Sequence, residues 1–286
     1  MAGTAVLRDG RLRSFLFPHA LDALSGTIAF DASGIRLDGL RARLADGPVQ
    51  FGGRVGLHGL KVTDYDITLT GQDLRLRYPE GMRSLVDATL TVQGPVDAPV
   101  LGGSLLVRSA VWTPAFDASG RVFGGGGSAP AEAVSGPGVT GVVSAPASGL
   151  RYDVRLIAPS TFRIENDLAR IVASADLTLR GTLERPLVFG RAEIERGEVR
   201  FEGRRYLVSQ GTLDFTNPSR IQPFFDIEAE TRVRAPGQTY RVTLRIAGTT
   251  ERLQPEFTSD PPLPPADVLS LLLSDATPAG DVEVAS

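Results

Sequence analysis

The chain has 286 residues, of which 42% are hydrophobic and 22% charged, and its mean hydropathy is +0.01. This composition is typical of a folded soluble chain rather than of a disordered or membrane-spanning one. The net charge of −3 offers no basic surface for nucleic acid. The absence of cysteine excludes disulfides, thiolate nucleophiles and thiolate metal sites.

Alternation of apolar and polar side chains is the main pattern along the chain. At residues 49–57, apolar or small residues occupy the odd positions, and Gln50 and Arg54 lie between them. A period of two predicts half-buried strands. The alternation recurs at residues 65–69, 74–78, 88–92, 152–156, 171–179, 225–229 and 240–246. About twenty strands at a spacing of about 4.8 Å would form a sheet roughly 90–100 Å long. The predicted fold class is therefore all-β, an elongated curled sheet with an open groove and one or two short helices.

Two segments favour helices, residues 18–24 and residues 265–273. The second has Pro265 at its first position and Asp267 in its first turn, which are helix start signals. Its apolar stripe consists of Val268, Leu269, Leu272 and Leu273. Because a helix this short is unstable alone in water, the stripe must dock on something. We expect Leu269 and Leu272 to carry that contact, either as a cap on the end of the sheet or against a partner.

An internal repeat supports a repetitive architecture. The segment LTVQG at 90–94, with Pro99 and Gly103, aligns without gaps at an offset of 87 with LTLRG at 177–181, Pro186 and Gly190. A looser third copy, VTLRIAG at 242–248, is followed by Pro255. Repeated supersecondary units indicate a quasi-one-dimensional fold.

The search for catalytic residues gives no constellation. The carboxylate pairs Asp64 with Asp66 and Glu193 with Glu195 occupy the polar parity of their strands, which predicts a solvated face. The histidines at 19 and 58 stand alone among apolar or glycine neighbours. We therefore expect no enzyme activity, no catalytic residues, no metal site and no cofactor.

The apolar parity instead predicts a binding face. We expect one residue set to line the interior of the curved sheet, with burial less complete than in a closed sandwich. These groove-lining residues are Phe51, Val55, Ile67, Leu90, Val154, Ile194, Phe225, Val242 and Leu244.

The second half of the chain resembles a known family. It contains, in order, LTLRGTLERPLVFGRAEIERGEVRF (177–201), YLVSQGTLDF (206–215), IQPFFDI (221–227), IAGT (246–249) and FTSDPPLPPADVLSLLL (257–273). Together these segments resemble the C-terminal conserved region of the translocation and assembly module TamB family, which is AsmA-like. Residues 26–107 resemble the preceding repeats of that family more loosely.

The resemblance implies a periplasmic cell-envelope protein of Gram-negative bacteria, anchored in the inner membrane when full-length. The fold it implies is a long β-taco whose groove carries phospholipid towards the outer membrane. Some members work with an Omp85-type partner in outer-membrane protein assembly or secretion. We expect this chain, which lacks the anchor, to be a fragment or one part of a split gene. The alternative from the residues is a structural or adhesin-like β-solenoid, and an outer-membrane barrel is a further one.

The expected organisation has four parts. Residues 1–118 form a β-repeat region of the groove, and residues 119–149 form a Gly/Ser/Ala/Pro-rich flexible insertion. Residues 150–260 form the TamB-like β-groove region. Residues 261–286 contain a Pro-rich turn, the Leu-rich capping helix and a disordered tail.

Overall fold

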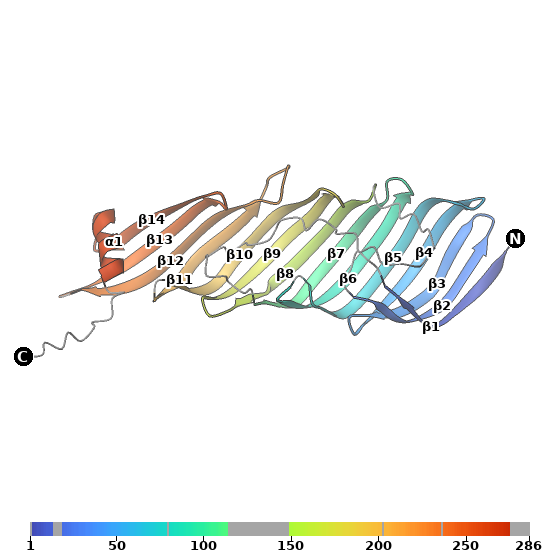
Figure 1. Cartoon of the computed structure of the whole chain (residues 1–286), viewed down its shortest axis with the longest axis horizontal. Helices are drawn as coiled ribbons and strands as arrows, with labels where there is room; N and C mark the ends of the chain where they lie inside the picture. The colour runs from blue at the N-terminus through green and yellow to red at the C-terminus, as the bar shows by residue number, and fades with distance from the viewer. Residues whose placement is uncertain are drawn as a thin grey trace, which may run out of the picture.

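The computed structural model describes residues 2–13, 19–78, 80–113, 149–201, 203–235 and 237–274. Fourteen strands of these residues form one sheet in sequence order, and the sheet curls without closing. Figure 1 shows the strands side by side from the N-terminal end to the C-terminal end, where the helix lies. The predicted all-β fold with an elongated curled sheet is confirmed.

The elements have the following bounds. The strands are β1 (Gly3–Leu12), β2 (Leu21–Asp31), β3 (Gly34–Leu44), β4 (Gly47–His58), β5 (Lys61–Leu76), β6 (Met82–Pro95), β7 (Val100–Trp112), β8 (Arg151–Glu165), β9 (Ala169–Thr182), β10 (Pro186–Phe201), β11 (Arg204–Phe215), β12 (Pro223–Ala235), β13 (Gln238–Thr249) and β14 (Arg252–Asp260). The helix is α1 (Pro265–Ser274).

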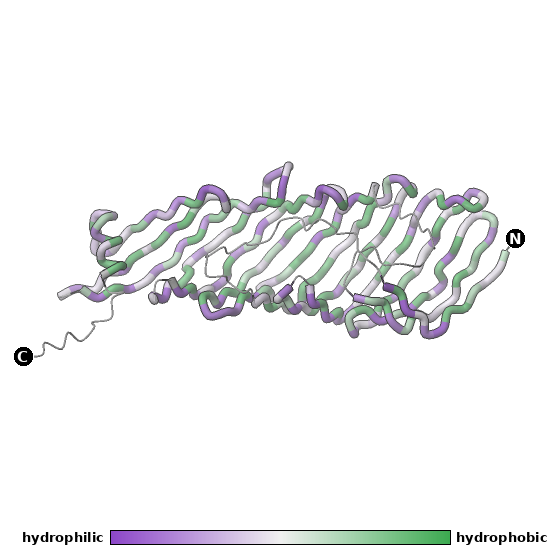
Figure 2. The backbone as a smooth tube through the Cα atoms, viewed as in Figure 1, coloured by the Kyte–Doolittle hydropathy of each residue, from purple (hydrophilic) through white to green (hydrophobic). Residues whose placement is uncertain are grey.

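The alternating segments lie in strands, and Figure 2 shows the alternation as bands of opposite hydropathy along each strand. The strands are fewer and longer than expected, because the alternations at 65–69 and 74–76 belong to one strand, β5, and are separated by a bulge. Fourteen strands at a spacing of about 4.8 Å give a sheet about 60 Å long rather than 90–100 Å.

One expected helix is replaced by a strand. Leu21 to Leu24, the larger part of the segment at 18–24, begin β2, and Leu21 pairs with Leu44 of β3. A turn and a half of helix gains few hydrogen bonds, whereas the strand pairs along its length, so cross-strand pairing overrides the local preference.

The sequence repeat corresponds to two equivalent hairpins. Gly103 of β7 lies opposite Leu90 of β6, and Gly190 of β10 lies opposite Leu177 of β9. Gly103 and Gly190 have φ angles of 117° and 118°, a region that side chains other than glycine rarely adopt. The repeated glycine therefore fixes a backbone conformation at the same register position of both hairpins.

The strands pair antiparallel, except that within the described residues β7 and β8 form a parallel pair. The chain between them includes the predicted flexible insertion at 119–149, which lies outside the described residues apart from Gly149. The predicted tail after residue 274 also lies outside them. The boundaries of the four expected parts remain predictions.

A row of β-bulges crosses the middle of the sheet. Register shifts occur between Gly71 and Leu74, Leu106 and Ala110, Ala158 and Phe162, Ile194 and Arg196, and Val208 and Gln210. The pairing places these shifts at similar heights in β5, β7, β8, β10 and β11. Because a bulge bends its strand and increases the local twist, a continuous row of bulges bends the whole sheet along one line. This row accounts for the curl.

Polar side chains tie the bulges to neighbouring strands. The Asp87 carboxylate of β6 accepts hydrogen bonds from the backbone N–H of Asp73 at 2.9 Å and from Arg108 Nη1 at 2.8 Å. In β8, Thr161 Oγ1 donates to the Val107 carbonyl at 2.6 Å, and Ser160 Oγ donates to Glu195 at 3.1 Å. Two of these bonds satisfy backbone groups at the interrupted ladder, the Asp73 N–H and the Val107 carbonyl, and the other two join side chains of different strands.

Candidate functional site

The register places the nine predicted groove-lining residues on one face of the sheet. In the N-terminal half, Phe51 lies opposite Leu69, and Leu69 lies opposite Leu90. Gly103 of β7 lies opposite Leu90 of β6 and also opposite Val154 of β8, so Leu90 and Val154 are on the same face. The remaining members follow from the pairs Gly53–Ile67, Val154–Leu179, Ala173–Ile194, Ala192–Leu213, Leu213–Phe225 and Ala229–Leu244, and from the period of two along β4 and β13. We call this surface the apolar face.

Most of the apolar face is only partly covered. Phe51, Val55, Ile67, Leu90, Ile194 and Leu244 are half-buried, whereas Val154, Phe225 and Val242 are buried. The described residues contain a single sheet and no second sheet that would cover it. The apolar face is thus incompletely covered, and the role of these residues in lining a groove and in binding a ligand remains a prediction.

Two clusters of buried residues on the apolar face lie beside the bulge row. One cluster contains Ala42, Val49, Leu74 and Ala88 from four successive strands, β3 to β6. A second contains Val86, Val107, Ala110 and Ala158. Small side chains at these positions allow the curled strands to approach, since interiors pack at nearly crystalline density.

Helix α1 modifies the C-terminal end of the apolar face. Val242 and Val233 form a cluster with Val268 and Leu272 of α1, and the first three are 0% exposed. The assignment of Val242 to the open lining is therefore corrected, because α1 covers this residue. Of the two residues expected to carry the contact of the helix, Leu272 is buried against the sheet together with Val268, whereas Leu269 is 43% exposed. A contact of Leu269 with a partner remains a prediction.

Arg204 fixes the C-terminal end of α1. Its Nε donates to the carbonyl oxygen of Leu272 at 3.1 Å. The last carbonyls of a helix have no partners within the helix and carry partial negative charge, so a guanidinium at this end is favourable. This functional contact had no local sequence signal, because Arg204 is distant from α1 in the chain and precedes an ordinary strand.

The opposite face of the sheet is polar and carries cross-strand ion pairs. Arg155 donates through Nε and Nη2 to both carboxylate oxygens of Asp176, at 2.8 and 2.6 Å. Arg245 contacts both oxygens of Asp226 at 3.0 Å. The hydrogen bonds from the arginines hold the pKa values of Asp176 and Asp226 below their ordinary value. Because these side chains are largely exposed, the pairs contribute to solubility and register more than to stability.

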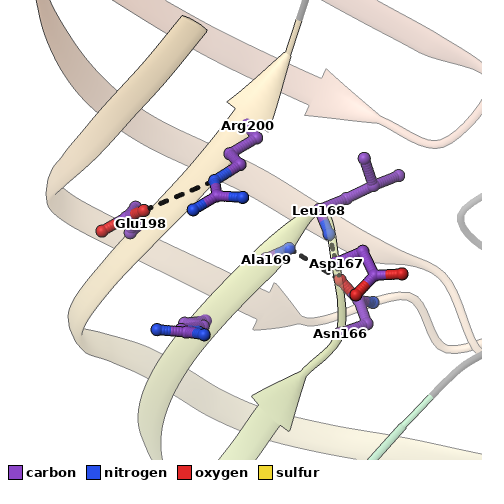
Figure 3. Close-up of a pocket in the computed structure, with 7 residues that line it drawn as sticks. Asn166, Asp167, Leu168, Ala169, Glu198 and Arg200 are labelled. Atoms are coloured by element: carbon purple, nitrogen blue, oxygen red, sulfur yellow. Dashed lines mark hydrogen bonds and ion pairs between the residues drawn. The ribbon is translucent and has the colours of Figure 1, made fainter. Parts of the chain in front are cut away.

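A small polar hollow lies at the β8–β9 turn (Figure 3). Its volume is about 70 Å³. Asn166 Oδ1 accepts the backbone N–H groups of Leu168 and Ala169 at 2.9 and 2.6 Å, and Arg200 N–H donates to the Leu168 carbonyl at 2.7 Å. The polar groups in view thus stabilise the turn itself. The apolar face remains the candidate functional site.

The sequence matches the family model of the TamB C-terminal domain over residues 38–285. The chain belongs to the TamB family. The match includes most of β3, all of β4 to β14 and helix α1. The TamB family comprises cell-envelope proteins that act as transport and assembly modules. In the described residues of this TamB domain, no helix has the length and apolar character needed to cross a membrane.

Proposed function

We propose that this TamB domain is part of a conduit that carries phospholipid acyl chains along its apolar face towards the outer membrane. The observation that carries the proposal is the unbroken register of apolar side chains across β4 to β13, on a sheet without a second covering sheet among the described residues. Large exposed apolar surfaces on soluble proteins mark binding sites.

The chemistry of the face suits a chain that moves along it. Burial stabilises an acyl chain by about 0.8 kcal/mol for each methylene, without directional bonds. The nine predicted lining residues, including Val242 beneath α1, are all aliphatic or phenylalanine. A methylene can therefore leave one side chain and reach the next at a similar free energy, which favours translocation over binding at one fixed position.

The wider role follows from the family. As a TamB domain, the chain would act in the periplasm as part of an inner-membrane-anchored protein that spans the Gram-negative envelope. It would support the assembly or secretion of outer-membrane proteins with an Omp85-type partner. Phospholipid is the ligand of the proposal, and no nucleic acid or cofactor takes part in it.

Photo-crosslinking tests the proposal. A photoreactive amino acid that replaces Leu90 lies on the apolar face. The same photoreactive amino acid in place of Thr89 lies on the polar face and is the matched control. We expect mass spectrometry to find phospholipid attached at position 90 and not at position 89. Equal attachment at both positions, or none at position 90, contradicts the conduit and favours a structural, adhesin-like sheet.

A charge placed on the face gives a second readout. Leu90→Asp puts a carboxylate in the path of the acyl chain, which removes apolar contact and adds a desolvation cost. We expect this variant to lose co-purifying phospholipid, whereas Thr89→Asp retains it. Similar unfolding temperatures of the two variants would show that the loss arises at the groove. Equal lipid content in both variants contradicts the proposal.

A further inference from the structure

Helix α1 occupies the face that the proposed ligand would use. Val242 lies opposite Thr231, and Val233 lies opposite Tyr240, in the same register that carries Leu244 and Phe225 on the apolar face. The two valines are covered by α1. At β12 and β13, an acyl chain and α1 therefore compete for the same surface.

The attachment of α1 to this surface is limited. The buried contacts are made mainly by Val268 and Leu272, which lie one helical turn apart, and Arg204 binds the Leu272 carbonyl. Leu269 and Leu273 on the same helix are 43% and 63% exposed. A helix of ten residues has little stability of its own, so docking on the sheet keeps α1 in place.

The segment before α1 keeps the helix close to the sheet. Ser259 of β14 donates through Oγ to the Pro261 carbonyl at 2.9 Å and accepts the Leu263 N–H at 2.9 Å. Pro264 and Pro265 follow, and their fixed φ angles restrict the directions that the chain can take. A helix tethered in this way can leave the apolar face and return to it without long-range movement.

We propose that α1 is a displaceable plug that closes the C-terminal end of the groove, and that an acyl chain reaching this end displaces it. This inference rests on the proposed function of the apolar face. Val268 and Leu272 of α1 make aliphatic contacts with Val233 and Val242. The methylenes of an acyl chain would make the same kind of contact with these two valines. Because the two occupants exclude each other, a change that weakens α1 docking raises lipid affinity at this end by up to the same factor.

A distance measurement between spin labels detects the movement. The chain has no cysteine, so Leu269→Cys on α1 and Thr239→Cys on the polar side of β13 provide the two labelling sites. Both positions are exposed, so the labels leave the buried contacts intact. Without lipid we expect one narrow distance distribution. Phosphatidylglycerol in mild detergent should add a second, broader population at longer distance, while detergent alone should not.

Two neighbouring arginines give a matched test of the plug. Arg204→Ala removes the bond to the Leu272 carbonyl, whereas Arg205→Ala removes an equal charge that pairs with Glu198. We expect Arg204→Ala to populate the longer distance without lipid and to bind phosphatidylglycerol several-fold more tightly. Arg205→Ala should resemble the unmodified chain. Leu272→Ser, which weakens docking from the helix side, should reproduce the effect if Arg204→Ala fails to fold.

Crosslinking at Leu90, far from α1 in the sheet, separates the two proposals. If phospholipid attaches at position 90 but the distance distribution and the affinities of the variants do not change, α1 is a permanent cap and the inference is overturned while the conduit stands. If no phospholipid attaches at position 90, the conduit fails, and the plug fails with it. Attachment at position 90 together with lipid-dependent displacement of α1 supports both.

Discussion

The repeated glycine offers a sharp test of how this sheet obtains its shape. Gly103 has a φ angle of 117° and faces Leu90 across the β6–β7 ladder. A Cβ atom added at Gly103 would lie 2.9 Å from the Leu90 Cα and still closer to the Thr89 carbonyl oxygen. Both neighbours are backbone atoms, so neither can move without separating the strands. Gly103→Ala should therefore weaken the β6–β7 pairing.

The expected magnitude is large for one methyl group. An L-residue with positive φ costs about 1–2 kcal/mol, and overpacking against rigid neighbours costs about 1–3 kcal/mol more. The sum, about 3 kcal/mol, corresponds to a more than 100-fold larger population of the open hairpin and to equally faster amide exchange through it. Gly102→Ala is the control, because its Cβ would lie 3.4 Å from Thr91 Oγ1 and its φ angle is ordinary. It should be neutral or stabilising by up to about 1 kcal/mol, since alanine loses less backbone entropy than glycine.

Hydrogen exchange of the β6 and β7 amides measures both variants in the folded protein. We expect protection to fall strongly in Gly103→Ala and to hold in Gly102→Ala. Equal exchange in the two variants would refute the argument that the repeated glycine is required by its backbone conformation. A loss of protection in Gly102→Ala alone would refute the assigned register as well.

Two further predictions concern the bulge row and the helix. The N–H of Asp73 and, to a lesser degree, Arg108 hold the pKa of Asp87 below its ordinary value of 3.8. The stability that this lowered pKa contributes is present above the ordinary pKa and is lost as the pH falls through the lowered pKa. Asp87→Asn should therefore make the unfolding temperature less sensitive to pH below about 4, and an unchanged dependence on acid pH would contradict this. Leu272→Ala should lower the free energy of α1 docking by about 2 kcal/mol, because the Leu272 side chain is buried, and should speed hydrogen exchange of the α1 amides about 30-fold. Leu273→Ala changes an exposed side chain and should leave this exchange unchanged. Equal effects of the two changes would disprove the assigned docking face.

The period-two pattern was sufficient to predict the all-β fold and the open, curled single sheet, but not the number or the length of the strands. It could not predict the bulge row, because a bulge is defined by two strands and appears in one sequence only as a polar residue out of place. Asp73, Asp87 and Ser160 have polar side chains like many others in these strands, and no local pattern distinguishes them. Their contacts to neighbouring strands show that they mark the line of curvature.

The helix was predicted in the right place, but its apolar stripe did not show which residues contact the sheet. The residues from Val268 to Leu273 are apolar at five of six positions, so more than one stripe at helical spacing is possible. The choice between Val268 and Leu269 is made by the direction in which the proline segment and Arg204 hold the helix. Neither constraint can be read from the helical pattern, which is why Val242 was also assigned to an open surface.

The sheet behaves physically as a row of hairpins rather than as a globule with one core. In the described residues, the extensive contacts of each strand are with its neighbours in sequence, and the three apolar clusters lie at separate places along the row. Stability in such a structure is close to a sum of neighbouring interactions. The Gly103→Ala change should therefore loosen β6 to β8 while the amides of β12, β13 and α1 keep their protection. Loss of protection at both ends would show instead that the sheet opens as one cooperative unit, and a local plug at α1 would then be untenable.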